Sequence, residues 1–312
     1  MSSSASAIGI DIGGSKIAAG LVTDGGTVLR RAEVPTPARE GGSMIITAAA
    51  AVAAQVAADA APVAVGVGTA GIVDRFGTVV SATDLLTDWI GVDVAGRIGA
   101  ELSGGREVLP VAVANDVHAH AVGEARAGAG ADAETVLVVA AGTGLGGAVV
   151  QHGAPVVGSH GAAGHLGHLP SAAAGDLLCS CGRTGHLEAV ASGYGLLQLY
   201  RSMGGAGSVP DARALGALTA DDPIAERAVV ASGHALGSTI GGAINLVDPD
   251  LVIISGGLIK LGAPWWSSVR DGTASSVLPY LDKVRLVAAK RGDDAAIIGA
   301  ALLAFDRAGA AE

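Results

Sequence analysis

Residues 7–22 read AIGIDIGGSKIAAGLV, and residues 135–150 read TVLVVAAGTGLGGAVV. Each stretch consists of an apolar run, a glycine-rich turn and a second apolar run, which is the pattern of two buried antiparallel strands. Segments with helical and strand patterns alternate after each of them. A chain that repeats this opening predicts an α/β fold built by duplication, with a cleft between its two halves.

The segments that follow these hairpins define the expected halves. Helices are expected at about residues 43–60, 116–126, 186–201, 223–247 and 295–305, and strands at residues 62–68, 109–114 and 251–255. We expect a smaller lobe at residues 1–116 and a larger lobe at residues 117–294. Residues 295–312 are expected to form a helix that packs back on the first lobe.

Composition limits the class of protein. The 312 residues exceed what one compact core usually needs, which agrees with two lobes. The net charge is −10 and only 3% of the residues are aromatic, so a nucleic-acid partner is not expected. No segment resembles a signal peptide, and the most apolar stretch, residues 45–61, is interrupted by Gln55 and Asp59. We therefore expect a cytoplasmic protein with no membrane partner.

The turn of the first hairpin contains Asp11, Gly13, Gly14, Ser15 and Lys16. Glycines let a backbone approach a ligand closely, and free N–H groups can face phosphate oxygens. A carboxylate at the end of a strand can hold Mg²⁺ through water. On this motif alone, phosphate binding and a hairpin without a ligand remain equally open.

The turn of the second hairpin contains Gly142, Thr143 and Gly144 and matches the G-x-G-x-x-G pattern of dinucleotide-binding folds. A strand-like segment rather than a helix follows it, and the chain has no acidic residue between Glu134 and Asp176 to bind a ribose. These features exclude a Rossmann fold, and no G-x-x-x-x-G-K-[ST] sequence indicates a P-loop. A second phosphate-binding hairpin, facing the first across the cleft, fits better.

Two further candidates lie at the ends of predicted strands. Gly256 and Gly257 follow residues 251–255, where glycines can let a nucleotide lie against the backbone, although a plain strand-to-helix turn explains them equally well. Asp116 lies between a strand and a helix. It is a candidate general base for phosphoryl transfer, but an Asp at such a place is, taken alone, more often the N-cap of the helix.

Residues 164–188, GHLGHLPSAAAGDLLCSCGRTGHLE, contain both cysteines of the chain. Cys179 and Cys181 are too close in sequence for a disulfide framework, but they can bind one ion together. His168 and His186 complete a tetrahedral set, which predicts a structural zinc site with four protein ligands. His165 is then left over, either in solvent or facing a ligand. The alternative is a pair of buried thiols among surface histidines.

In combination these motifs resemble the ROK family (repressors, open reading frames and kinases) over nearly the whole chain. The matching elements are D-I-G-G-[ST]-K at residues 11–16, G-x-x-G-x-V-D at 68–74, N-D at 115–116, G-T-G-x-G-G at 142–147, G-x-x-G-H at 164–168, C-x-C-G-x-x-G-C-x-E at 179–188 and N-x-x-D-P at 245–249. The resemblance implies a two-lobed actin-like ATPase (ribonuclease H-like) fold. It also implies an ATP-dependent sugar kinase that uses Mg²⁺, carries structural Zn²⁺ and forms a homodimer.

The resemblance further implies roles for single residues. Asp116 would be the base that deprotonates the 6-hydroxyl of the sugar. Asp11 and both glycine turns would serve Mg²⁺ and phosphate, and Gly256 and Gly257 would lie near the adenine. The residues at sugar-contacting positions are Gly71, Asp84, Asn115, Asp116, His165, His168 and Glu188.

Three positions depart from the family pattern. His186 replaces the third cysteine and keeps a zinc ligand. Asp84 replaces an asparagine, so hydroxyl recognition should differ, because a carboxylate only accepts hydrogen bonds. His165 replaces a glutamate of glucokinase-like members, and its segment resembles the A-G-H-x-G-H of bacterial N-acetylmannosamine kinases. Since an imidazole can donate a hydrogen bond to an acetamido carbonyl, N-acetylmannosamine is the favoured substrate.

Three alternative functions differ from this one in the residues that they require. A glucokinase of the same family would share the mechanism and differ in the pocket, at His165 and Asp84. A transcriptional regulator would carry an N-terminal helix-turn-helix, for which the first hairpin leaves no room because it begins within ten residues of Met1. A non-catalytic sugar-binding protein disagrees with the intact Asp11, Asp116 and glycine turns.

Overall fold

The computed structural model describes residues 5–105 and 108–310, which form two compact α/β units. Unit 1 comprises Met1–Asp132, Gly153–Ala163 and Lys290–Glu312, and unit 2 comprises Ala133–His152 and Gly164–Ala289. The first boundary falls after Asp132 rather than at the expected Asp116, because the helix that begins at Asp116 packs on the C-terminal helix. Of the helix expected at residues 295–312, residues 311–312 lie outside the described ranges.

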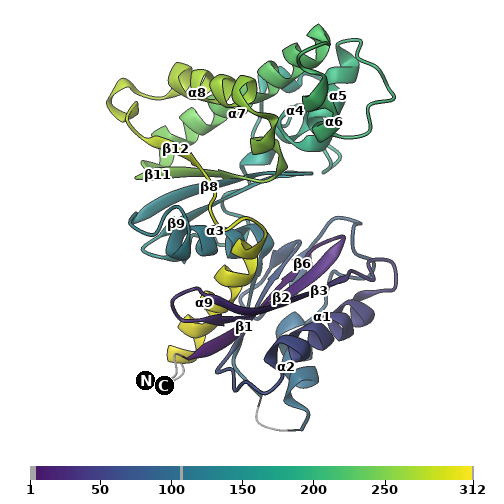
Figure 1. Cartoon of the computed structure of the whole chain (residues 1–312), viewed down its shortest axis with the longest axis vertical. Helices are drawn as coiled ribbons and strands as arrows, with labels where there is room; N and C mark the ends of the chain where they lie inside the picture. The colour runs from purple at the N-terminus through teal and green to yellow at the C-terminus, as the bar shows by residue number, and fades with distance from the viewer. Residues whose placement is uncertain (1–4, 106–107, 311–312) are drawn as a thin grey trace. The chain divides into compact units, whose positions relative to one another are not determined.

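Unit 1 contains the first hairpin, the parallel strands that follow it and the C-terminal helix (Figure 1). Its elements are β1 (Ser6–Ile12), β2 (Lys16–Thr23), β3 (Val28–Pro35), α1 (Gly42–Ala57), β4 (Val65–Thr69), β5 (Ile72–Val73), β6 (Val79–Ser81), α2 (Val94–Ser103), β7 (Val111–Asn115), α3 (Asp116–Ala127), β10 (Ala154–Pro155), the short 3₁₀ helix η5 (Gly292–Asp294) and α9 (Ala295–Gly309).

The sheet of unit 1 has the strand order β3-β2-β1-β4-β7. The pairs β1–β2 and β2–β3 are antiparallel, whereas β1, β4 and β7 run parallel. Alternate residues of a strand point to opposite faces of the sheet. Ile8 and Ile10 therefore join the core under α1, while Gly9 between them faces α9.

The helix α9 lies directly on a row of glycines. Gly20, Gly9 and Gly66 are cross-strand neighbours on β2, β1 and β4. A β-carbon on Gly9 would overlap the carbonyl oxygen of Ile297, and one on Gly66 would overlap that of Ala300. The missing side chains thus allow the backbone of α9 to approach the sheet, as Figure 1 shows for this yellow helix beside β1 and β2.

Unit 2 contains the second hairpin and most of the remaining helices. Its elements are β8 (Thr135–Ala141), β9 (Leu145–Gln151), the 3₁₀ helices η1 (Leu166–His168) and η2 (Ala172–Ala174), α4 (Glu188–Ala191), α5 (Gly193–Ser202), α6 (Ala212–Leu218), α7 (Pro223–Val247), β11 (Leu251–Ser255), η3 (Gly257–Leu261), α8 (Ala263–Ser276), η4 (Pro279–Leu281) and β12 (Arg285–Ala288).

The sheet of unit 2 repeats the plan of unit 1. The strands β9, β8, β11 and β12 are neighbours in this order; β8 and β9 are antiparallel, and β8, β11 and β12 are parallel. Each unit therefore has an antiparallel hairpin joined to parallel strands. This arrangement confirms the α/β duplication predicted from the two glycine-rich hairpins.

The helix expected at about residues 186–201 is divided into α4 and α5. Ser192 lies between them in an extended conformation, with φ −97° and ψ 171°. Its hydroxyl oxygen accepts a hydrogen bond from the N–H of Gly195 at 2.9 Å, so Ser192 is the N-cap of α5. None of the helices in the described ranges is long and apolar enough to cross a membrane.

Candidate active site

Two carboxylates of unit 1 stand at the ends of two strands that are separated by one strand of the sheet. Asp11 lies near the end of β1, and Asp116 directly follows β7; β4 runs between these strands. Gly68 of β4 is opposite Asp11 on one side and opposite Ala114 on the other. A β-carbon on Gly68 would lie 3.7 Å from the Cα of Asp116. Since Gly68 has no side chain, nothing from β4 fills the space between the two acids at this position.

The electrostatics of this strand edge favour a cation. Burial raises the pKa of Asp11 to about 7; the charges of Asp116 and Asp293 add to the rise, and Lys16 opposes it. A carboxyl group raised in this way becomes an anion at neutral pH when a cation binds beside it. These residues therefore fit a Mg²⁺ ion, the role predicted for Asp11.

Asn115, rather than Asp116, caps helix α3. The Oδ1 of Asn115 accepts hydrogen bonds from the backbone N–H groups of Val117 at 3.0 Å and His118 at 3.3 Å. Its Nδ2 donates to the carbonyl oxygen of Gly71 at 2.9 Å. Asn115 thus fixes the start of α3 and the position of Gly71. The N-cap of α3 is therefore Asn115 rather than Asp116, whose Oδ1 accepts a hydrogen bond from the N–H of Val117 at 2.9 Å.

The other predicted sugar-contacting residues of unit 1 lie in the connections around β5 and β6. Gly71 has φ +102°, and a β-carbon there would collide with the backbone of β6, so glycine is required at this position. Asp84 is exposed, and its backbone carbonyl accepts a hydrogen bond from Arg39 at 3.1 Å. The next residue, Leu85, lies 3.8 Å from the β-carbon position of Gly14. The residue that follows Asp84 thus lies next to the first glycine turn, which places the Asp84 segment beside that turn.

The first glycine turn is a closed hairpin with an exposed tip. The N–H of Gly13 donates to the carbonyl oxygen of Lys16 at 3.1 Å, and the hydroxyl of Thr36 donates to the carbonyl of Gly13 at 2.7 Å. Gly14 and Ser15 are exposed. Neither Gly13 nor Gly14 has a positive φ, so the backbone conformation does not require glycine. A phosphate that approaches the turn closely would explain both glycines.

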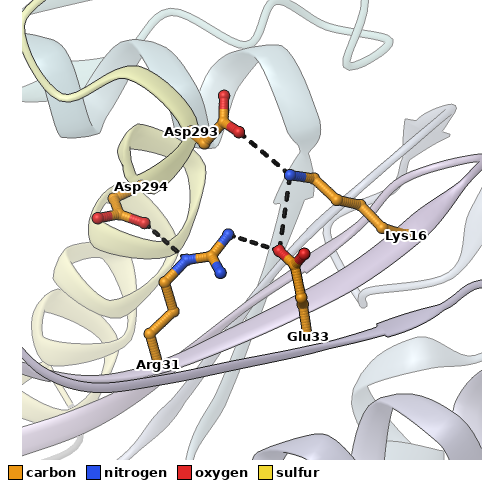
Figure 2. A network of polar contacts seen from close by, with 5 residues as sticks. All are labelled: Lys16, Arg31, Glu33, Asp293 and Asp294. Carbon is orange, nitrogen blue, oxygen red and sulfur yellow. Dashed lines mark hydrogen bonds and ion pairs between the residues drawn. The ribbon is translucent and has the colours of Figure 1, made fainter.

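Lys16 takes part in a network of charged side chains (Figure 2). Its Nζ lies 3.2 Å from Asp293 and 3.7 Å from Glu33. Arg31 in turn contacts Glu33 at 2.8 Å and Asp294 at 2.9 Å. The network joins β2 and β3 to η5, the segment before α9. Lys16 was predicted as a phosphate ligand, but in this structure its ammonium group is held by two carboxylates.

Unit 2 contains a cavity of about 1020 Å³ beside the second glycine turn. Gly142 and Thr143 line it from the turn between β8 and β9, and Gly257 lines it from the start of η3. Open space surrounds the β-carbon positions of Gly142 and Gly257, and neither has a positive φ. The exposed backbone and the volume fit a nucleotide, since ligand pockets typically measure about 300–1,000 Å³.

Two of the predicted nucleotide-site glycines do not line this cavity. Gly256 has φ +90°, and a β-carbon there would overlap the carbonyl group of Ala141. A β-carbon on Gly144 would lie 3.1 Å from the Oε2 of Glu188. Gly256 thus allows β11 to end close to β8, and Gly144 leaves room for the Glu188 carboxylate. Both have structural reasons to be glycine.

Four polar residues that line the cavity were not predicted from the sequence, and one of them, Asp211, is the N-cap of α6. The other three, Tyr194, Arg213 and Lys260, line it from α5, α6 and η3. Lys260 follows the Gly256–Gly257 pair closely and could have been suspected as a phosphate or ribose contact. Tyr194 and Arg213 carry no local signal, because only the packing of α5 and α6 around the second hairpin brings them to the cavity.

The four predicted zinc ligands form one cluster. The ligand atoms of His168, Cys179, Cys181 and His186 all lie within 4.8 Å of one another. The Sγ of Cys179 is 3.6 Å from the Nδ1 of His168, and the Sγ of Cys181 is 3.2 Å from the Nδ1 of His186. A tetrahedral zinc ion separates its ligands by roughly 3.3–3.8 Å. The cluster therefore fits zinc with small adjustments.

The backbone explains how this cluster forms. The N–H of Cys179 donates to the carbonyl of Arg183 at 2.8 Å, and that of Gly182 donates to the carbonyl of Cys179 at 2.9 Å. This tight turn brings Cys179 and Cys181 together. An isolated antiparallel β-bridge pairs Pro170 with His186, so the end of the segment lies beside its beginning. Burial raises the pKa of Cys179 to about 11, so a bound metal ion would have to displace its proton.

Glu188 and His165 flank the cluster. Glu188 is buried; it accepts hydrogen bonds from the N–H of Leu145 at 2.9 Å, from Cys179 at 3.4 Å and from Ser180. It thus links the cluster to the second hairpin. The His165 ring stacks on that of His168, with centroids 6.2 Å apart. The Nδ1 of His165 is buried without a hydrogen-bond partner among the described residues, so its hydrogen-bonding capacity is unused in this structure.

Known proteins resemble this chain along its whole length. The sequence model of the ROK family matches residues 7–307. A glucokinase from Thermotoga maritima is 29% identical over 97% of this chain and 98% of its own length. An N-acetylmannosamine kinase from Shigella boydii is 33% identical over 95% of this chain and 97% of its own.

A solved crystal structure is also similar to this chain over nearly its whole length. The crystal structure of a ROK family glucokinase from Streptomyces griseus, in complex with glucose and AMPPNP, covers 96% of this chain and 99% of its own. The TM-score is 0.81 at 29% sequence identity. This likeness confirms the actin-like ATPase fold that the sequence predicted.

Replacing Asp11 by Asn should stabilise the protein at neutral pH. Because the pKa of Asp11 is about 7 in the folded state and 3.8 for an ordinary aspartate, ionisation of Asp11 increasingly favours unfolding as the pH rises from 4 to 7. Asp11→Asn removes this penalty. We expect the free energy of unfolding to rise by about 1–2 kcal/mol at pH 7.5, less than the full shift because Asp11 is partly exposed.

Urea denaturation of both proteins at two pH values measures this effect. Near pH 3, the carboxyl group is largely protonated in both states, so most of the gain should disappear. If the variant is no more stable than the parent protein at pH 7.5, the surroundings do not destabilise the ionised carboxylate of Asp11.

Proposed function

Because the chain belongs to the ROK family, we propose that it is an ATP-dependent sugar kinase that phosphorylates the 6-hydroxyl of a hexose or an N-acetylhexosamine. The observation that carries this proposal is the pair of carboxylates at the ends of β1 and β7, where Asn115 rather than Asp116 is the N-cap of α3. The cavity at Gly142, Thr143 and Gly257 supports a nucleotide as the second substrate.

In this proposal Asp116 is the general base. Its carboxylate accepts the proton of the sugar hydroxyl as that oxygen attacks the γ-phosphate. Mg²⁺, held by Asp11 through water, would neutralise charge on the phosphates. The backbone at the tip of the first turn and at Gly142 would bind phosphate oxygens. Such positioning supplies most of the catalysis in phosphoryl transfer.

Asp116→Asn is expected to lower kcat by at least about a hundredfold, because an amide cannot accept the hydroxyl proton. A coupled ADP-release assay with MgATP measures this loss, and circular dichroism and zinc content should stay unchanged. Asp271→Asn, which changes an exposed carboxylate of α8, is the matched control and should keep normal turnover. Near-normal turnover in Asp116→Asn would refute the assignment.

We also propose that zinc occupies the cluster of His168, Cys179, Cys181 and His186. The two sulfurs and two imidazoles are the donors that zinc prefers, and four protein ligands leave no open position for catalysis. Zinc would fix the segment that carries His165, since His168 is both a ligand and its stacking partner. Its role is therefore to shape the sugar-binding surface of unit 2.

Metal analysis tests the zinc site. The purified protein should contain about one zinc ion per chain, and Cys181→Ser should lose most of it, because the remaining three ligands bind zinc more weakly. The exposed His234 provides a control, and His234→Gln should keep the metal. Removal of zinc by a chelator should also raise the KM for the sugar. Loss of zinc with unchanged sugar affinity would contradict a role in the sugar pocket.

For the sugar itself, we propose N-acetylmannosamine. The unpartnered Nδ1 of His165 supports an acetamido group as its partner, because an imidazole can donate to a carbonyl oxygen and a glutamate carboxylate cannot. The N-acetylmannosamine kinase relative agrees with this choice. Glucose is the second candidate, favoured by the similarity to glucokinases at comparable identity. We further propose, from the family resemblance, a homodimer that works in the cytoplasm.

The substrate proposal is tested by His165→Glu. We expect the ratio of kcat/KM for N-acetylmannosamine to kcat/KM for glucose to fall by at least about tenfold, which corresponds to about 1.4 kcal/mol of lost discrimination. Mannose and N-acetylglucosamine complete the panel. The exposed His234 again serves as control, as His234→Glu adds the same charge elsewhere on unit 2. An unchanged ratio would show that His165 does not read the 2-position.

A further inference from the structure

Unit 1 contains a second cavity, of about 710 Å³, that the proposed phosphoryl transfer does not use. It runs along β7, the last strand in the order of the sheet, and residues 111–115 all line it. Its lining also includes the apolar side chains of Phe76, Val80 and Val157. All three are more than two-fifths exposed, at 68%, 49% and 45%. The walls are thus apolar and open to solvent.

The turn from Asp74 to Gly77 gives one wall a fixed shape. The carboxylate of Asp74 accepts hydrogen bonds from the N–H groups of Phe76 and Thr78, both at 2.9 Å. A β-carbon on Gly77 would lie 3.1 Å from the side chain of Val113, so the turn rests directly on β7. The negative charge of Asp74 is therefore engaged within the turn.

Two exposed arginines line this cavity. Arg75 lies over the ring of its neighbour Phe76, 4.7 Å from the ring centroid, and Arg307 lines the cavity from α9. Among the described residues, no carboxylate forms an ion pair with either arginine, and the carboxylate of Asp74, which also lines the cavity, is bonded to backbone N–H groups. In a chain of net charge −10, two such arginines at one cavity form a local site for an anion.

We propose that this cavity is a regulatory site for a small phosphate monoester. Guanidinium groups bind phosphate through paired, charge-assisted hydrogen bonds, and a phosphate monoester carries about two negative charges near neutral pH, which two arginines balance. The apolar walls accommodate the carbon skeleton. The volume lies within the range of small-molecule sites, about 300–1,000 Å³.

The cavity is connected to the residues that position Asp116. Asn115, which caps α3 and holds Gly71, is the last residue of β7 and lines the cavity. His118 also lines it, and its Nε2 lies 3.0 Å from the carbonyl oxygen of Ala163, two residues before His165 in the chain. A ligand that contacts β7 and His118 can therefore shift the position of Asn115 at the start of α3 and the position of the segment that contains Ala163. This regulatory step rests on the proposed kinase function, whereas binding does not.

Calorimetry with glycerol 3-phosphate tests the binding. The compound should bind the intact protein, and both Arg75→Gln and Arg307→Gln should weaken binding at least about tenfold. Arg285→Gln, which removes an exposed arginine of β12 in unit 2, is the matched control and should bind like the parent protein. Asp116→Asn should also bind normally, so a failure of the kinase proposal would be distinguishable.

Hydrogen exchange locates the site. Glycerol 3-phosphate should slow the exchange of amides in residues 111–115 relative to those of β1, and glycerol should not. In the kinase assay it should change kcat or KM by at least about twofold in the parent protein and not in Arg307→Gln. Absence of binding, or equal affinity of both arginine variants and the parent, would overturn the proposal. Protection by an acidic peptide but not by glycerol 3-phosphate would also overturn it and indicate a peptide-binding strand edge.

Discussion

The structure of unit 1 depends on the close approach of the α9 backbone to the sheet. Gly20, Gly9 and Gly66 form a row across three strands, and side chains on Gly9 or Gly66 would collide with carbonyl oxygens of the helix. The same helix meets α3, where a β-carbon on Gly299 would overlap the carbonyl of Ala119. Close packing of this kind leaves no tolerance for added volume. It fixes α3, and with it Asp116, relative to β1.

Because α9 packs on this sheet, the acidic residues just before it lie beside basic residues of the first hairpin and β3. The segment before α9 carries Asp293 and Asp294, which reach Lys16 on the first hairpin and Arg31 on β3. Glu124 of α3 is fully buried and accepts hydrogen bonds from the backbone of Lys290 and Arg291. Buried and partly buried charges are stable when they are paired in this way. Asp11 lies among these charges with a raised pKa, so unit 1 presents an edge prepared for a cation.

Local features were predictable because each depends on a few neighbouring residues. The glycine-rich hairpins follow from apolar runs and turns, and the metal cluster from two cysteines and two histidines within one short segment. The structure differs from the expected local picture where distant residues decide. Ser192 divides a predicted helix, and α3 packs on α9 so that the unit boundary moves beyond Asp116. Lys16 finds carboxylate partners that a local motif cannot reveal.

The sequence by itself determined the duplicated α/β plan, the residues at the strand ends and the set of soft metal ligands, since hydrophobic period, glycine turns and ligand spacing are local properties. Only the tertiary structure decided that Asn115 is the helix cap, that Gly142 and Gly257 share a cavity while Gly144 and Gly256 serve packing, and that Arg75 and Arg307 line one cavity. Each of these depends on strands and helices that are remote in sequence, and only close packing brings such residues within reach of one another.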